Sequence, residues 1–173
     1  MEPRDNIPGY RYRNAMLNQS HEYLLPMLNN LLDSLNLGPT QRRIFELGCG
    51  NGSVADQLTR RGFEVIGVDP SEEGVAHANK TYPHLKISRA SAYDDLAGRF
   101  GCFPIVISLE VIEHVFFPRK FASAVFDLLA DGGISIISTL YHGYWKNLAL
   151  ALTGKMDAFC LGSDLIMKKS DAI

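Results

Sequence analysis

The chain has 173 residues, of which 46% are hydrophobic and 21% are charged, and its formal net charge is −2 at pH 7. This length and composition are ordinary for one soluble globular domain with a sizeable core. The small net charge provides no general field to attract nucleic acid or an anionic membrane. No apolar run approaches the ~18 residues of a membrane span, and the N-terminus lacks the pattern of a signal peptide.

The cysteines indicate the redox setting. Cys49, Cys102 and Cys160 have no metal-binding spacing, and any disulfide would leave one of them unpaired. We therefore expect a reducing compartment and predict a cytoplasmic protein. Cys49 is expected to act as a small residue and not as a nucleophile, because no histidine lies near it in sequence to activate the thiol.

The N-terminal segment predicts one helix. Leucines recur at helical spacing from Leu24 to Leu35. Pro26 is tolerated in the first turn of a helix, so we expect the helix to start or to break between Tyr23 and Pro26. The Gly-Pro pair at positions 38–39 should end it.

The most informative stretch is residues 44–52, which read IFELGCGNG. An apolar run predicts a buried strand, and helical spacing follows the stretch. Between them, glycines stand at alternate positions, Gly48, Gly50 and Gly52. Glycine permits a positive φ and lets a ligand approach the backbone, so this strand, turn and helix are typical of a nucleotide-binding site. Ser53 and Asp56 have the spacing of a helix capping box, and Gly62 stands where a glycine ends a helix.

The next apolar run, FEVIGVD, predicts a strand that is covered on both faces and ends at Asp69. A carboxylate at this place can accept hydrogen bonds from both vicinal hydroxyls of a ribose. The glycine pattern is GxGxG, whereas a dinucleotide fingerprint is GxGxxG, so a pyrophosphate ligand is disfavoured.

ELGCGNG followed by VIGVDPS resembles motif I and the acidic motif II of the class I S-adenosylmethionine-dependent methyltransferases. The resemblance implies an α/β fold, with a doubly wound and mostly parallel sheet of strand order 3-2-1-4-5. It implies that S-adenosylmethionine is the cofactor and S-adenosylhomocysteine the product. The alternative is a glycine turn that merely joins a strand to a helix. The cofactor-binding residues that the resemblance implies are Glu46, Gly48, Cys49, Gly50, Asn51, Asp69, Pro70, Ser71, Ser91, Ala92 and Leu109.

Roles within that set also follow from the resemblance. Glu46 would hold the loop and the cofactor's ammonium, the glycine loop would approach the methionine half, and Asp69 would bind the ribose. In methyltransferases that resemble this chain, an N-terminal helical segment lies over the mouth of the site. Side chains that could line such an entrance are Tyr10, Arg11, Tyr12, Arg13 and His21. The alternative is a solvated lead-in whose leucines pack on the domain.

After Asp69, the sequence predicts a helix that starts near Ser71, with acids in its first turn, and ends at Pro83. A short strand, LKISR, then leads into the loop that corresponds to the family's adenine-contacting segment. The adenine contact is left open between the Ser91 hydroxyl, the Ala92 backbone and the Asp94 carboxylate. An ordinary polar turn is the alternative for this loop.

A fourth strand, FPIVISL, leads into LEVIEHVFFP. Glu110, Glu113 and His114 have i, i+3, i+4 spacing, so one helical turn would place all three on one face toward the cleft. We predict that they are catalytic. His114 could take a proton from an acceptor hydroxyl, or the three side chains could hold a metal ion. The alternative is that Glu113 and His114 only cap and orient the loop.

ExxEHVxxP resembles the equivalent stretch of ubiquinone-biosynthesis O-methyltransferases, and its ExxEH core resembles that of small-RNA 2′-O-methyltransferases. In both families these positions are associated with a divalent ion, and the ion that Glu110, Glu113 and His114 could hold in this chain is Mg²⁺. We therefore expect O-methylation of a small hydroxylated aromatic acceptor of the quinone-precursor type. RNA 2′-O-methylation is the second hypothesis, with His142 as a candidate further histidine, although the chain lacks a basic excess. A non-catalytic or truncated cofactor-binding protein is the third.

The resemblance divides the chain into three parts: a helical lead-in or cap (1–39), a cofactor-binding core (40–140) and a shortened tail (141–173). The core ends with an amphipathic helix and the apolar strand ISIISTL. The tail shows no clear final hairpin to cover this fifth strand. An uncovered edge invites pairing with another chain, so we expect a homodimer through it and weak or absent methyl transfer. A tail helix that caps the edge is the competing prediction.

Overall fold

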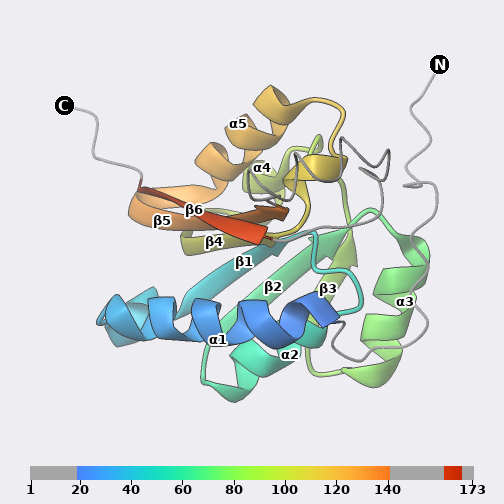
Figure 1. Cartoon of the computed structure of the whole chain (residues 1–173). Coiled ribbons are helices and arrows are strands. Elements are labelled where there is room, and N and C mark those ends of the chain that lie inside the picture. The colour runs from blue at the N-terminus through green and yellow to red at the C-terminus, as the bar shows by residue number, and fades with distance from the viewer. Residues whose placement is uncertain (1–18, 141–161, 169–173) are drawn as a thin grey trace, which may run out of the picture.

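A computed structural model describes residues 19–140 and 162–168 of the chain. A six-stranded sheet forms its centre, and helices cover both faces of the sheet (Figure 1). The strands are β1 (Arg43–Leu47), β2 (Glu64–Asp69), β3 (Lys86–Arg89), β4 (Phe103–Leu109), β5 (Leu129–Leu140) and β6 (Gly162–Lys168). The helices are α1 (Gln19–Ser34), α2 (Ser53–Arg60), α3 (Glu72–Thr81), α4 (Leu96–Phe100) and α5 (Pro118–Leu128), with 3₁₀ turns η1 (Pro39–Gln41) and η2 (Ile112–His114).

The strand order is β3-β2-β1-β4-β5-β6, and the first five strands are parallel. The predicted doubly wound sheet of order 3-2-1-4-5 is confirmed. Because parallel strands end at the same edge of a sheet, the turns after β1, β2, β3 and β4 lie together. Leu47, at the end of β1, is paired with Val68, one residue before the end of β2. The candidate residues after these strands therefore share one edge.

Adjacent residues of the central strand β1 point into two different cores. Ile44 belongs to the cluster that includes residues of α1, α2 and α3, whereas Phe45 belongs to the cluster with α4 and α5. Both side chains are fully buried. Since side chains alternate between the faces of a strand, a strand covered on both faces is apolar at every position. The near-continuous apolar runs of the sequence have this origin.

Helix α1 differs from its predicted bounds. It begins at Gln19, continues through Pro26 and ends at Ser34, before the Gly-Pro pair. A proline inside a helix costs about 3 kcal/mol. Burial of a leucine contributes about 1.5–3 kcal/mol, and four leucines of α1 are buried, three of them in the core cluster with strand residues, which outweighs the proline. Neither α1 nor any other helix in the described ranges has the length and apolarity needed to cross a membrane.

The predicted capping box of α2 is wrong. Gly52, with φ 76°, occupies the N-cap position, so Ser53 is already the first helical residue. The side-chain oxygen of Asn51 accepts a hydrogen bond from the Ser53 N–H at 3.2 Å. Asp56 instead accepts from Arg60, at 2.8 Å. Gly62 does end the helix in a left-handed conformation, as its position predicts.

The expectation of an uncovered fifth strand is also wrong. β6 runs antiparallel to β5, with pairs from Ile134↔Lys168 to Leu140↔Gly162. The outer edge of β5 is therefore paired over these residues, by a strand and not by a helix, and the predicted homodimer through it loses its physical basis. The sequence GSDLIMK has too short an apolar run to identify a strand, and the neighbouring edge of β5 decides its conformation.

We expect a chain that ends before Gly162 to self-associate, because the β5 edge that β6 pairs would become available to another copy. Light scattering should then show a mass that rises with protein concentration. A chain that ends after Lys168 keeps β6 and is the matched control. Equal masses for the two chains would show that β6 is not needed to protect the edge.

Candidate functional site

The glycine turn after β1 is folded tightly over the end of β2. Gly48, Gly50 and Gly52 have φ values of 85°, 52° and 76°. The N–H groups of Gly48 and Cys49 both donate to the Val68 carbonyl, at 2.8 and 3.0 Å. A Cβ at Gly48 would overlap the Val111 side chain, which follows β4. Glycine is therefore needed at Gly48 for the backbone conformation and for the close packing of the two loops.

Asp69 holds this turn from the end of β2. Its Oδ2 accepts from the Gly50 N–H and its Oδ1 from the Ser71 N–H, both at 2.8 Å. The residue is 6% exposed. Burial raises the pKa of Asp69, and the two N–H donors act in the opposite direction. Because a carboxylate has about four acceptor positions, two remain for ligand hydroxyls.

Glu46, in β1, is a second buried acid beside the turn and is only 3% exposed. Burial, and secondarily the charge of Asp69, raise the pKa of Glu46 to about 8. Its buried Oε2 has no hydrogen-bond partner in the described ranges. An unpartnered buried polar atom is costly, and an ammonium group of a ligand would satisfy it. Glu46 thus fits the ammonium role that the family resemblance implies.

Cys49, in the same turn, is also buried. Burial, Glu46 and Asp69 all raise the pKa of its thiol well above its ordinary value. The thiol therefore stays protonated near neutral pH, and nothing in its surroundings prepares it as a nucleophile.

The remaining residues of the implied cofactor set lie at the same edge. Ser71 caps α3 by accepting from the Gly74 N–H at 3.0 Å. Pro70 accepts from Arg89 at 3.2 Å through its carbonyl, and Leu109 ends β4. These contacts account for the local fold. Cofactor binding by Pro70, Ser71 and Leu109 stays a prediction.

Two side-chain hydrogen bonds to the backbone shape the loop after β3. Asp94 Oδ2 accepts from the Ser91 N–H at 2.8 Å, and Ser91 Oγ accepts from the Tyr93 N–H at 3.3 Å. Such bonds are typical of Asx and Ser turns, so the loop has the polar-turn geometry that the sequence offered as an alternative. The choice among Ser91, Ala92 and Asp94 for an adenine contact stays open.

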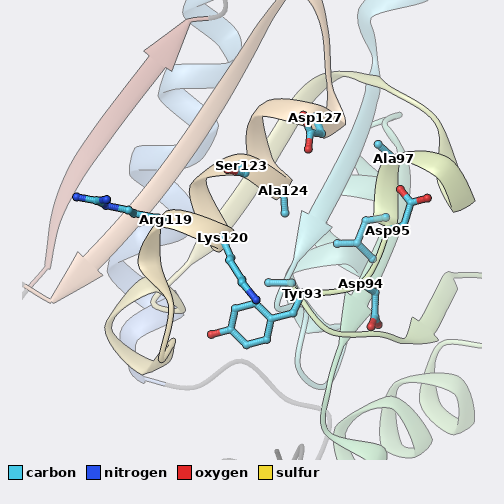
Figure 2. Close-up of a pocket in the computed structure, with 11 residues that line it drawn as sticks. Tyr93, Asp94, Asp95, Ala97, Arg119, Lys120, Ser123, Ala124 and Asp127 are labelled. Atoms are coloured by element: carbon cyan, nitrogen blue, oxygen red, sulfur yellow. The ribbon is translucent and has the colours of Figure 1, made fainter. Parts of the chain in front are cut away.

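A cavity of about 370 Å³ lies between this loop and α5 (Figure 2). Tyr93 forms one wall: its ring packs on Phe117 at 5.7 Å, and its hydroxyl accepts from the Phe117 N–H at 3.1 Å. The lining mixes both signs of charge, with Lys120 toward Tyr93 and Asp127 farther along α5. Sequence reasoning did not identify this cavity, because its walls are more than 20 residues apart in the chain.

The segment after β4 does not form the predicted helical turn. Glu110 has a left-handed backbone with φ 56° and precedes η2, which contains Glu113 and His114. The α-helical spacing of i, i+3 and i+4 therefore does not apply, and the three side chains have different surroundings. Glu110 Oε1 accepts from the Tyr23 hydroxyl at 3.0 Å, and Glu113 Oε2 accepts from Thr139 at 3.3 Å. His114 is exposed.

The predicted Mg²⁺ site is not supported. Across residues 19–140 and 162–168, no three side chains of His, Cys, Asp or Glu come close enough to hold a metal ion. Glu110 and Glu113, two of the three predicted ligands, instead accept hydrogen bonds from Tyr23 and Thr139. Other candidates lie outside the described residues: Tyr10, Arg11, Tyr12, Arg13 and His142, as does Cys160, and the side chain of His21 is not described.

Known proteins resemble both the sequence and the fold. A family described as Methyltransferase domain matches residues 16–161. Ubiquinone biosynthesis O-methyltransferases of Bradyrhizobium diazoefficiens and Caulobacter sp. strain K31 are 38% and 37% identical over 117 and 116 residues. Each match covers 65% of this chain, and 45% and 46% of the two relatives. The chain thus covers less than half of the curated relatives it matches.

Solved structures share the architecture. An S-adenosylmethionine-dependent methyltransferase from Mesorhizobium loti is 26% identical, with a TM-score of 0.53 over 67% of this chain and 53% of that one. A magnesium protoporphyrin IX methyltransferase from Synechocystis PCC 6803 has a TM-score of 0.63, over 87% of this chain and 80% of that one. At 18% identity, the second likeness shows the fold alone. The family match covers most of the sequence, and the chain belongs to the S-adenosylmethionine-dependent methyltransferase family.

Proposed function

We propose that this chain transfers a methyl group from S-adenosylmethionine to a hydroxyl of a small aromatic acceptor of the quinone-precursor type. The observation that carries the proposal is the position of the EVIEH segment, directly against the glycine turn through Val111 and Gly48. The 38% identity to ubiquinone biosynthesis O-methyltransferases supports the choice of acceptor. That segment offers carboxylates and an imidazole where a hydroxyl would approach the cofactor.

The cofactor would lie along the shared edge of the sheet. Glu46 would pair with its ammonium, the turn from Gly48 to Gly52 would accommodate the methionine half, and Asp69 would accept from the ribose hydroxyls. When bound, the cofactor supplies an electrophilic methyl group that an in-line nucleophile can displace. The loop after β3 adjoins Asp69 through the Ala90 N–H, which donates to the Asp69 carbonyl at 3.2 Å, so it is suited to contact the adenine.

The acceptor must lose its hydroxyl proton as the new C–O bond forms. His114 is exposed beside the turn and is our candidate for the base, and Glu110 and Glu113 are candidates to orient the hydroxyl. A positioned base typically contributes about 10²–10⁴ in rate. The protein would then supply orientation and proton removal, without an assigned metal ion.

The partner we propose is a small-molecule acceptor, and the compartment is the cytoplasm, in keeping with the free thiols of Cys49 and Cys102. Methyl transfer to catechols, polyprenyl phenols and RNA ends would test the choice of acceptor. Transfer to a phenolic hydroxyl is expected. Transfer to RNA alone would favour the second hypothesis, and binding of S-adenosylhomocysteine without any transfer would favour a non-catalytic protein.

We expect Asp69→Ala to weaken S-adenosylhomocysteine binding about ten- to a hundredfold, because it removes charge-assisted hydrogen bonds worth about 1.5–3 kcal/mol. Part of this loss would come from the Gly50 and Ser71 N–H groups that lose their acceptor. Calorimetry measures the affinity. Glu64→Ala, which removes an exposed acid at the opposite end of β2, is the matched control. Unchanged affinity in Asp69→Ala would contradict the assignment.

Cofactor affinity should depend on pH through Glu46. The free protein holds Glu46 neutral below its pKa of about 8, whereas pairing with an ammonium requires the ionised form. Binding should therefore release a proton, and affinity should rise from pH 6 to 7.5 by up to about tenfold per pH unit. Glu46→Gln should bind more weakly at pH 7.5 and lose this dependence. A wild-type affinity that is flat over this range would argue against the pairing.

Ionising Glu46 also opposes folding of the free protein, because its raised pKa means that the folded state favours the neutral acid. The stability that the neutral acid provides is fully present below the ordinary pKa of 4.5, and it is lost as the pH rises toward 8.

We expect His114→Ala to lower turnover by about 10² while cofactor affinity stays nearly unchanged, because an exposed base acts on the acceptor and not on the cofactor. Steady-state kinetics and calorimetry separate the two effects. His84→Ala, an exposed histidine before β3 at the opposite edge of the sheet, is the control. Should the substitution abolish cofactor binding, a structural role in the loop would explain it better. Loss of wild-type turnover in chelator, with recovery in Mg²⁺, would reopen the metal hypothesis.

A further inference from the structure

Two residues outside the predicted site converge on Glu110. Tyr23, in α1, donates its hydroxyl to Glu110 Oε1 at 3.0 Å. Ser138, in β5, accepts from the Glu110 N–H through both its carbonyl and its Oγ, each at 3.1 Å. Glu110 is thus held at its backbone by one strand and at its carboxylate by a helix 87 residues away in sequence.

The backbone of Glu110 requires such support. Among the described residues, only Glu110 and Asn36 are non-glycine residues with positive φ. Asparagine tolerates this conformation, whereas glutamate has no such preference. A residue keeps a strained backbone only when its surroundings hold it there, and such residues cluster at functional sites. Ser138 is only 2% exposed, so the acceptor of this contact is buried.

The strained residue lies beside the glycine turn, where the proposed function puts the methionine half of the cofactor. Val111 follows it and packs so closely on Gly48 that no Cβ would fit there. Of the two carboxylate oxygens of Glu110, Oε1 accepts from Tyr23. The hydrogen bonds of the described part of the chain leave Oε2 available to accept from another hydroxyl.

We propose that Tyr23 is a positioning residue for methyl transfer. Its hydroxyl fixes the rotamer of Glu110, so that Oε2 faces an acceptor hydroxyl, while Ser138 fixes the backbone of the same residue. Helix α1 is then part of the acceptor site and not only a cover packed on the domain. This inference rests on the proposed function, because it assigns Tyr23 a role in a step that needs a hydroxyl acceptor.

A double-mutant cycle tests the inference. Tyr23→Phe should lower kcat about tenfold and leave the S-adenosylhomocysteine affinity unchanged, because only the orientation of Glu110 is lost. Glu110→Ala should lower kcat at least as much. In the Glu110→Ala background, Tyr23→Phe should have no further effect on kcat, since the group on which it acts is absent. Tyr82→Phe, at the end of α3, removes a hydroxyl far from Glu110 and should leave kcat unchanged.

Two results would overturn the inference: the same tenfold loss from Tyr23→Phe in both backgrounds, or a loss of cofactor affinity in Tyr23→Phe. Either would show that Tyr23 acts through the packing of α1 and not through Glu110.

A second measurement separates this inference from the proposed function. If the wild-type protein methylates none of the acceptors, the proposed function fails, yet side-chain NMR coupling constants of Glu110 still report how firmly its rotamer is held. Tyr23→Phe should average the Glu110 rotamer, because it removes the donor to Oε1, and Tyr82→Phe should not. An unchanged rotamer in Tyr23→Phe would show that the Tyr23 hydroxyl does not position Glu110.

Discussion

The carboxylate of Asp69 is the constraint on which the candidate site depends. Its two oxygens accept from the Gly50 and Ser71 N–H groups, so one buried side chain joins the turn after β1 to the turn before α3. Burying a charge is costly unless hydrogen bonds compensate, and the raised pKa of Asp69 reflects the uncompensated part. A ribose that occupied the remaining acceptor positions would add donors where the protein itself lacks them.

Glu46 complements Asp69 across the same turn. Burial, and secondarily the charge of Asp69, raise the pKa of Glu46 to about 8. In the free protein Asp69 holds the loop through two N–H donors, and Glu46 keeps an unpartnered oxygen. A cationic ligand would stabilise the ionised form of Glu46, which burial disfavours. The electrostatics of the free site therefore favour a ligand that carries an ammonium group.

The segment after β4, which we propose as the acceptor side, is organised differently, by contacts from distant elements. Tyr23 and Ser138 hold Glu110, and Thr139 donates to Glu113, so α1 and β5 determine the shape of the segment after β4. The pairing of β6 with β5 in turn protects the strand that carries Ser138 and Thr139. A substitution in α1 or β6 would therefore alter the segment after β4 without a direct contact to the glycine turn.

The sequence by itself determined the buried strands, the glycine turn and the acid at the end of β2, and its resemblance to a known family implied the sheet order. The first three features follow from local patterns: apolar runs covered on both faces, glycines where φ is positive, and a carboxylate where a parallel strand ends. Local patterns failed at Ser53, which follows the true cap, and at Pro26, whose cost is offset by buried leucines.

Only the tertiary structure decided the surroundings of Glu110 and the strand β6. The spacing of the EVIEH segment predicts a shared helical face, yet the left-handed backbone at Glu110 is stabilised by residues 28 and 87 positions away. Residues 162–168 become a strand because the edge of β5 offers hydrogen-bond partners. Contacts between residues so far apart depend on how the helices and the sheet pack, and no local pattern encodes that packing.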